Sequence, residues 1–282
     1  MGIDQQVLRF LASSKSSGVS FASSLMIGRQ GFHALNRSDL QDGLKEFGIF
    51  LTLEDATKLL KESNGYVEAF LGFLGAGTVA SLDNSSYEGA TVICDLNAPI
   101  PGNMREQFSC VFDSGTLEHV FNFPQAIKNC MEMVSIGGHL IVATTANNFM
   151  GHGFYQFSPE LYYRILSDQN GFVLEDMVIC ETDKGSPWYK VSDPENLGRR
   201  VELVNRRPTY LMVRARKLRR ADIFSTNPQQ SDYAAIWAAK SVVSATKTGF
   251  LTSVRGMLPE SVKKHLRRLL GHRTAGAFRR VR

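Results

Sequence analysis

The sequence predicts an α/β protein of the doubly wound type, in which helices cover both faces of a mostly parallel sheet. Short apolar runs alternate with segments of helical periodicity between residues 22 and 217. Three of these runs end in an aspartate, at Asp83, Asp95 and Asp113. Because parallel strands end at one edge of a sheet and ligands bind beyond that edge, we expect the three carboxylates to share one crevice.

Composition is typical of a globular protein. The chain has 282 residues, 43% hydrophobic and 21% charged, which excludes fibrous and fully disordered classes and allows a large core. No apolar run reaches the roughly 18 residues of a membrane span, and the first residues lack a signal-peptide pattern, so we expect a cytoplasmic protein. The four cysteines form no CxxC pair, which favours buried thiols and no metal site.

The first part of the chain reads as a helix, a strand and a helical insertion. Residues 4–13 have helical spacing, and a Ser/Gly-rich linker follows to about residue 20. The apolar run 25–27 stops at Gly28, as a buried strand does before a tight turn. Residues 33–76 hold two helical segments, one capped by Ser38 and one beginning near Thr52.

The second part continues the strand and helix alternation. A helix should run from Pro124 to Gly137, and another from Ser158 to Gly171, each with a proline in its first turn. Strand-like runs lie at 139–147, 172–180 and 208–217, with a polar insertion at 181–208. The predicted organisation is therefore an N-terminal helix and linker (1–20), a main domain (21–220), and a linker with a basic helical tail (221–282).

Charge is concentrated in this tail. From Lys247 to Arg282 there are ten Lys and Arg residues against the single acid Glu260, a charge of +9 in a chain whose total is +5, which leaves −4 for residues 1–246. An acidic body makes nucleic acid an improbable partner. The tail predicts either a basic helix packed on the body or a contact with an anionic membrane surface or a polyanionic acceptor.

The stretch from 82 to 171 resembles the class I S-adenosylmethionine-dependent methyltransferases of the small-molecule type. The segments that carry the resemblance are SLDNSSYEGATVICDLNAPIP, FSCVFDSGTLEHVFNFPQAIKNCMEMVSIGGHLIV and GHGFYQFSPELYYRIL. It implies a Rossmann-like sheet of seven strands with an antiparallel last strand. It also implies S-adenosylmethionine as cofactor and methyl transfer to an O or N of a small molecule or glycan intermediate.

The resemblance also implies a set of cofactor-binding residues. Asp83 matches the acid that bonds the ribose hydroxyls, and a carboxylate can accept from two hydroxyls at once. The turn after the third strand faces the adenine, and the turn after the fourth lies near the methionine moiety. The matched residues are Gly28, Gly31, Asp83, Asp95, Leu96, Asp113, Ser114 and Gly115.

The first loop departs from the family pattern. Met26 and Gln30 stand where the family has an acid and a second glycine, so the motif reads GRQG, and Gly31 is left to let the chain turn. This departure supports an alternative, a non-catalytic scaffold that keeps the fold. A nicotinamide-dependent oxidoreductase is a weaker alternative, because GRQGFH does not supply G-x-G-x-x-G.

Two histidines are the candidate catalytic residues. His119 follows the fourth predicted strand and His152 lies in a glycine-flanked loop after the fifth, where each would reach the crevice. An imidazole titrates near neutrality and suits the removal of a proton from an acceptor. The competing interpretation is that His119 is a satisfied, partly buried imidazole and that His152 is a loop histidine bonded to local backbone.

Overall fold

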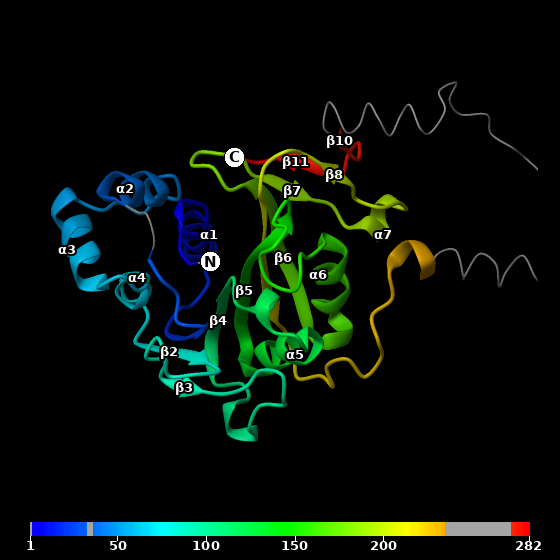
Figure 1. Cartoon of the computed structure of the whole chain (residues 1–282), viewed down its shortest axis with the longest axis horizontal. Coiled ribbons are helices and arrows are strands. Elements are labelled where there is room, and N and C mark those ends of the chain that lie inside the picture. Colours follow the sequence, from blue (N-terminus) through cyan, green and yellow to red (C-terminus); the bar gives the residue numbers. More distant parts are fainter. Residues whose placement is uncertain (1, 33–35, 235–271) are drawn as a thin grey trace, which may run out of the picture.

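The computed structural model describes residues 2–32, 36–234 and 272–282, which form one mixed sheet with helices on both sides (Figure 1). The nine strands of this sheet lie in the order β11-β7-β6-β9-β5-β4-β1-β2-β3. Their bounds are β1 Ser23–Ile27, β2 Thr78–Asp83, β3 Val92–Ile93, β4 Phe108–Ser114, β5 Val134–Asn147, β6 Phe172–Glu181, β7 Tyr189–Val191, β9 Thr209–Lys217 and β11 Phe278–Arg280. A second, two-stranded sheet pairs β8 Leu203–Val204 with β10 His272–Arg273.

The strand directions confirm the predicted sheet. β1 is parallel to β2 and β4, β2 is parallel to β3, and β4 is parallel to β5. β9 runs antiparallel between β5 and β6, which is the expected antiparallel last strand of a seven-stranded core. The antiparallel edge strands β7 and β11 were not predicted, and they extend the sheet from seven strands to nine.

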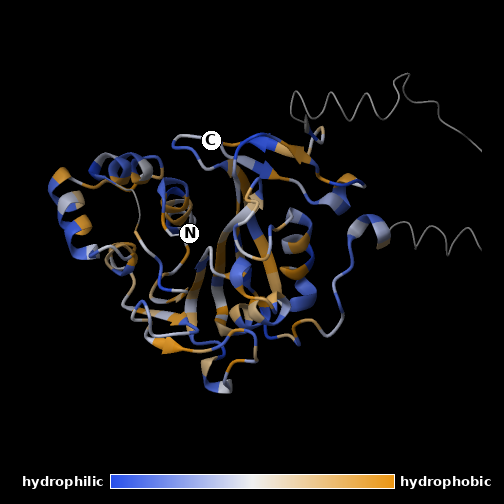
Figure 2. Ribbon diagram, in the orientation of Figure 1, coloured by the Kyte–Doolittle hydropathy of each residue, from blue (hydrophilic) through white to orange (hydrophobic). Residues whose placement is uncertain are grey.

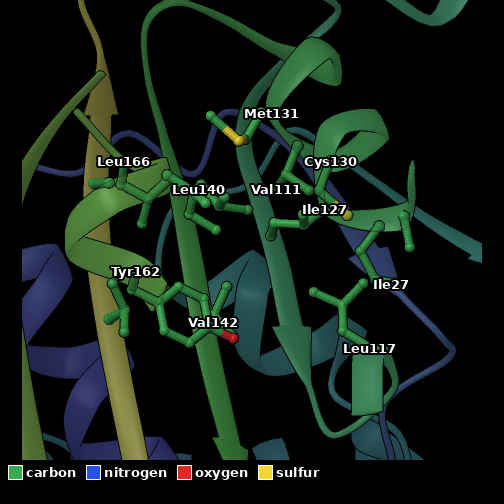
Figure 3. Packing of buried hydrophobic residues seen from close by; sticks show 14 of the residues in the cluster. Ile27, Val111, Leu117, Ile127, Cys130, Met131, Leu140, Val142, Tyr162 and Leu166 are labelled. Atoms are coloured by element: carbon green, nitrogen blue, oxygen red, sulfur yellow. The ribbon is translucent and has the colours of Figure 1, made fainter. Parts of the chain in front are cut away.

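Helices cover both faces because β1 and its neighbours are apolar on both sides. Leu25 and Ile27 face a core closed by α5 (Phe123–Met133) and α6 (Pro159–Ile165). Figure 3 shows part of this core around β4 and β5, with the ring of Tyr162 beside Val142. Met26 faces the opposite core, which four other helices close (Figures 1 and 2). These are α1 Gln5–Ser16, α2 Arg37–Lys45, α3 Leu53–Ser63 and α4 Glu68–Phe73.

Helix boundaries follow capping side chains. Asp4 caps α1, and Thr52 caps α3 by accepting from the amide of Asp55, so the second helical segment begins near Thr52 as predicted. The cap of α2 is Asn36, two residues before the expected Ser38. Asn36 and Asp39 form a capping box, and Ser38 donates to the side chain of Asn36 instead.

Two predicted helices are shorter than the sequence suggested. α5 ends at Met133 and β5 starts at once, so Gly137 and Gly138 lie inside a long strand instead of ending the helix. α6 ends at Ile165, and Gly171 follows a separate 3-10 turn, η3, at Asp168–Asn170. Val134, which would continue α5, is buried in β5, and Asn170 of η3 donates to the carbonyl of Ile165 at the end of α6.

The end of the chain differs from the predicted basic helical tail. The expected helix at 258–271 lies outside the described residues, but residues 272–282 form the strands β10 and β11. Val281 donates to the carbonyl of Trp188 (2.9 Å), and Trp188 donates to the carbonyl of Arg282 (2.9 Å). This part of the tail therefore completes the sheet.

Among the described residues, no helix combines the length and the apolar character needed to traverse a bilayer. All four cysteines are free thiols; Cys110, Cys130 and Cys180 are buried, as expected, whereas Cys94 is partly exposed.

Candidate functional site

The connections diverge between β1 and β4, at the centre of the sheet. From β1 the order runs outward to β2 and β3, and from β4 it runs the other way to β5, so a topological switch point lies between them. Ligands of doubly wound sheets bind beyond the carboxyl ends of the strands at such a point. With β9 inserted antiparallel between β5 and β6, this is the Rossmann-like, mostly parallel sheet with an antiparallel last strand that the sequence predicted.

Gly28 ends β1 in a conformation that favours glycine. Its φ is +69°, and a Cβ placed on it would lie 2.4 Å from Oγ1 of Thr116. That Oγ1 donates to the carbonyl of Ile27 (2.8 Å), as does Nε2 of Gln30 (2.6 Å). Gln30, which replaces the second glycine of the family pattern, is buried here, and its amide holds the first loop against the turn after β4.

The residues that precede α1 contact the loop after β1 and the end of β4. Ser114 donates to the carbonyl of Gly2 (3.1 Å), and the amide of Ile3 donates to the carbonyl of Gly31 (2.7 Å). Ile3 is fully buried. The structure thus brings Gly31 and Ser114 near the switch point, as predicted, but their polar groups already contact this chain.

Asp83 is the last residue of β2, and Asp95 follows the end of the adjacent strand β3. Asp83 is partly exposed, and its carboxylate accepts from the amide of Ser85 (3.4 Å). Asp95 is exposed and accepts from the amide and side chain of Asn97, which lower the pKa of its carboxyl group. Leu96 is buried beneath them. Both carboxylates keep acceptor capacity for a ligand.

Asp113 has a different environment. It is fully buried, and its Oδ1 accepts from the amides of Thr116 (3.1 Å) and Leu117 (3.3 Å). Burial, and then the charge of Glu118, raise the pKa of Asp113 well above its ordinary value, although the two amides oppose this. Gly115 completes the turn with a φ of +88°. The Asp113 side chain therefore holds the turn after β4, and a contact with cofactor stays a prediction.

Glu118 was not among the candidate site residues of the sequence analysis. It lies in the 3-10 turn η2 (Leu117–His119), and its side chain is 0% exposed. Oε2 accepts from the hydroxyl of Thr144 on β5 (3.1 Å), while Oε1 has no hydrogen-bond partner among the described residues. Burial is the main cause that raises the pKa of Glu118.

The loop after β5 folds back onto η2. The amide of Phe154 donates to the carbonyl of Glu118 (2.8 Å), and a Cβ on Gly153 would lie 2.8 Å from that carbonyl oxygen. Only a glycine allows this approach without displacing the backbone. As a result His152 comes to lie against His119, although 33 positions separate them in the sequence.

The two predicted catalytic histidines are therefore brought together, and Glu118 joins them. The imidazole centroids of His119 and His152 are 4.9 Å apart, and Nε2 of His152 is 3.7 Å from Oε1 of Glu118. Burial lowers the pKa of His152, and burial followed by the charge of His152 lowers that of His119. Both shifts favour the neutral form of the imidazole. In the sequence Glu118 directly precedes the candidate His119, and this adjacency is the signal that could have pointed to Glu118.

Exposed aromatic side chains surround this cluster. Phe121 is 72% exposed and Phe154 65% exposed, with their rings in edge contact at a centroid distance of 5.7 Å. Tyr155 donates to the carbonyl of Phe121 (2.7 Å), which ties the loop after β5 to the segment after η2. Met150 is 94% exposed on the same loop. An apolar surface thus borders the histidines.

Comparison with known proteins gives structural likeness only. No protein-family model matches the chain, and none of the curated proteins matches its sequence. Among solved structures, a protein assigned to the methyltransferases from Bacillus halodurans aligns over 77% of this chain and 99% of its own, at 12% identity and a TM-score of 0.43. The N-methyltransferase NodS from Bradyrhizobium japonicum, in complex with S-adenosyl-L-homocysteine, covers 76% and 86%, at 14% identity and a TM-score of 0.38.

A branched-chain polyamine synthase from Thermus thermophilus, in complex with N4-aminopropylspermidine and 5'-methylthioadenosine, aligns over 80% of this chain and 60% of its own. Its identity is 13% and its TM-score 0.38. These likenesses are too distant to carry a function over, so evidence for function must come from the residues of this chain.

Proposed function

We propose that the chain is an S-adenosylmethionine-dependent methyltransferase that acts on an oxygen or nitrogen of a small molecule or glycan intermediate. The observation that carries the proposal is the placement of Asp83 at the carboxyl end of β2 and of Asp95 just after the adjacent parallel strand β3, next to the switch point that Gly28 borders. Both carboxylates have exposed surface and free acceptor capacity. An adenosyl group offers the matching donors, two ribose hydroxyls and an exocyclic amine.

Methyl transfer from a sulfonium asks for positioning more than for covalent chemistry. The acceptor displaces the thioether in line, so a site that holds both reactants at the correct distance supplies most of the rate acceleration. In this proposal Asp83 binds the ribose, Asp95 and Leu96 face the adenine, and the turn from Asp113 to Gly115 lies near the methionine moiety. Gly28 and Gly31 shape the loop that borders it.

His119 and His152 are proposed to act on the acceptor. An acceptor hydroxyl or ammonium must lose a proton during transfer, and a neutral imidazole at the end of β4 or β5 can accept it. The pKa values of both histidines lie below the ordinary value, which keeps them in the accepting form. The exposed rings of Phe121 and Phe154 support an acceptor with an apolar face.

Calorimetry with S-adenosylmethionine tests the proposal. We expect submillimolar binding to the intact chain and at least tenfold weaker binding to Asp83→Asn. The asparagine carries no charge, so the ribose hydroxyls lose their charge-assisted hydrogen bonds to the carboxylate. Asp168→Asn is the matched control. Asp168 is an exposed acid of η3 that pairs with Arg219, and it is not among the proposed cofactor-binding residues. Equal affinity in all three proteins, or no binding to the intact chain, would contradict the proposal.

A specific observation favours the alternative of a non-catalytic scaffold. The segment before α1 bonds to Ser114 and Gly31, and the side chain of Gln30 lies buried against Thr116, so part of the expected methionine subsite is filled by the chain itself. Absence of binding by both S-adenosylmethionine and S-adenosylhomocysteine would favour this alternative. An oxidoreductase has less support, because the loop after β1 lacks the dinucleotide pattern.

The contact of the basic tail with an anionic membrane surface remains a proposal. The part of that tail predicted to be helical lies outside the described residues, so the support for this contact is the charge pattern of the sequence. Co-sedimentation of the full chain and a chain lacking 247–271 with anionic and neutral vesicles tests it. Equal sedimentation of the two proteins with anionic vesicles would exclude this role.

A further inference from the structure

The cluster at the ends of β4 and β5 contains two buried polar atoms that have no hydrogen-bond partner among the described residues. They are Oε1 of Glu118 and Nε2 of His152, which face each other at 3.7 Å. This distance is too long for a hydrogen bond. A buried carboxylate oxygen without a partner costs free energy, and native proteins satisfy nearly all such atoms with a group, a water or an ion.

A third potential ligand completes the cluster. One ligand atom each from Glu118, His119 and His152 can be chosen so that all three lie within 4.8 Å of one another. Metal bonds of about 2.1 Å place two ligand atoms of one ion roughly 3.0 to 3.5 Å apart. The side chains would therefore have to approach one another by about 1 Å, and the imidazole of His119, which is exposed, has the freedom to move.

We propose that Glu118, His119 and His152 bind one divalent transition-metal ion. Two imidazole nitrogens and one carboxylate oxygen form the donor set that Zn²⁺, Fe²⁺, Mn²⁺ and Co²⁺ accept, whereas Mg²⁺ and Ca²⁺ prefer oxygen ligands alone. Three protein ligands also leave at least one coordination position open. A site of this kind binds an exchangeable group instead of serving only to hold the fold together.

The surroundings of Glu118 orient it for this role. The hydroxyl of Thr144 occupies Oε2 and leaves Oε1 directed at the imidazole of His152. Gly153 and the amide of Phe154 hold the loop of His152 against the carbonyl of Glu118. Partners that fix the orientation of a ligating side chain are typical of metal sites. The cluster is thus positioned by three elements, η2, β5 and the loop after β5.

A bound ion would change how the site handles the acceptor, a consequence that rests on the proposed function. An acceptor hydroxyl at the open position would lose its proton more easily, because a metal ion lowers the pKa of an oxygen that it binds. The two histidines would then serve as neutral ligands rather than as bases. Binding of the ion itself does not depend on methyl transfer.

Metal binding can be measured without cofactor. We would strip the untagged full chain of metal, dialyse it against Zn²⁺ or Co²⁺, and determine bound metal and the Co²⁺ visible spectrum. We expect the intact chain to bind one equivalent of metal at this site. In His119→Ala, His152→Ala and Glu118→Gln that equivalent should be lost, with at least tenfold weaker metal binding. The matched control is His139→Gln, which removes a histidine that also faces a glutamate, Glu175 at 3.2 Å, but has no second histidine beside it in the described structure.

The exposed position of His119 keeps the test decisive. His119→Ala should fold normally, so its thermal unfolding should match that of the intact chain even if the variants of buried Glu118 do not fold. Unchanged metal binding in His119→Ala, or an equal loss in His139→Gln, would overturn the proposal. Because neither measurement uses S-adenosylmethionine, a negative result here and a negative result in calorimetry with S-adenosylmethionine remain distinguishable.

Discussion

Gly28 and Thr116 meet where β1 and β4 end, so closely that a Cβ on Gly28 would lie 2.4 Å from the Thr116 hydroxyl. That hydroxyl in turn donates to the carbonyl of Ile27, immediately before the glycine. The turn after β1 and the turn after β4 are therefore built as one unit. The glycine of the first loop serves this packing whether or not a cofactor is bound.

Gly28→Ala should destabilise the fold by about 2 to 4 kcal/mol, from a side chain held at positive φ and from the contact with Thr116. In a Thr116→Ala background the same substitution should cost about 1 kcal/mol less, because the nearest atom is gone. Urea unfolding of the four proteins measures this coupling. Equal costs in both backgrounds would mean that the close approach does not limit the turn.

Asp113 should act through its hydrogen-bonding shape rather than its charge. Asp113→Asn keeps an acceptor for the amides of Thr116 and Leu117, and we expect its free energy of unfolding to stay within about 1 kcal/mol of the intact chain. Asp113→Ala leaves both amides without that acceptor and should cost about 2 to 3 kcal/mol. Chemical denaturation distinguishes the two variants, and a larger loss in the asparagine variant would show that the carboxyl group itself is required.

Glu175 should make stability depend on acid pH. It pairs with Arg216 (2.8 Å) and His139 (3.2 Å) and with the buried Arg214 (3.4 Å). Burial alone would raise the pKa of Glu175, but the hydrogen bond from Arg216 and the neighbouring positive charges outweigh it, and the net pKa lies below the ordinary value of 4.5. A carboxylate with a lowered pKa stabilises the fold above that ordinary value and loses the effect as the pH falls through its folded pKa.

We therefore expect Glu175→Gln to be about 2 kcal/mol less stable than the intact chain at about pH 7, since it leaves Arg214 without a compensating charge. The difference should shrink as the pH falls below the ordinary glutamate pKa. Urea unfolding across this range measures it. Glu195→Gln is the control, because Glu195 is largely exposed. A difference that stays constant with pH would rule out this charge effect.

Removal of residues 278–282 should expose Trp188. This ring is 2% exposed, and its backbone pairs with Val281 and Arg282. We expect a red shift of Trp188 fluorescence, recorded in a Trp237→Phe background because the chain has two tryptophans, and a lower Tm. Arg279→Ala with Arg280→Ala keeps the β11 backbone and should change neither quantity. If the truncated chain retained the spectrum and Tm of the intact one, β11 would not contribute to the sheet.

Local patterns in the sequence were sufficient for the central elements. Apolar runs ending at Gly28, Asp83 and Asp113 correspond to β1, β2 and β4. Buried parallel strands need continuous apolar residues, and they accommodate polar side chains only at the strand ends. The antiparallel last strand followed from the resemblance, and β9 confirms it. Helix ends were less predictable, as Gly137 shows, because a glycine can lie in a strand as well as end a helix.

The site required the tertiary structure. Asp83, Asp95 and Asp113 each end an apolar run in the sequence, yet only Asp113 is fully buried, because it still pairs with β1 on one side and β5 on the other in the interior of the sheet. Nothing in the local sequence around His152 indicates that it contacts His119. Their proximity depends on Gly153 approaching the Glu118 carbonyl, which is a contact between distant segments.

Periodicity and burial are local properties, so the order of residues was enough to place the central strands and helices and the end of the sheet at which polar side chains gather. The partners of those side chains depend on the folded chain as a whole. The pairing of β11 with β7, the segment before α1 at Ser114, and the Glu118–His152 contact all join residues far apart in the chain. Such contacts form because packing of the whole chain lowers the free energy of the folded state, and that contribution cannot be read from a short stretch of sequence.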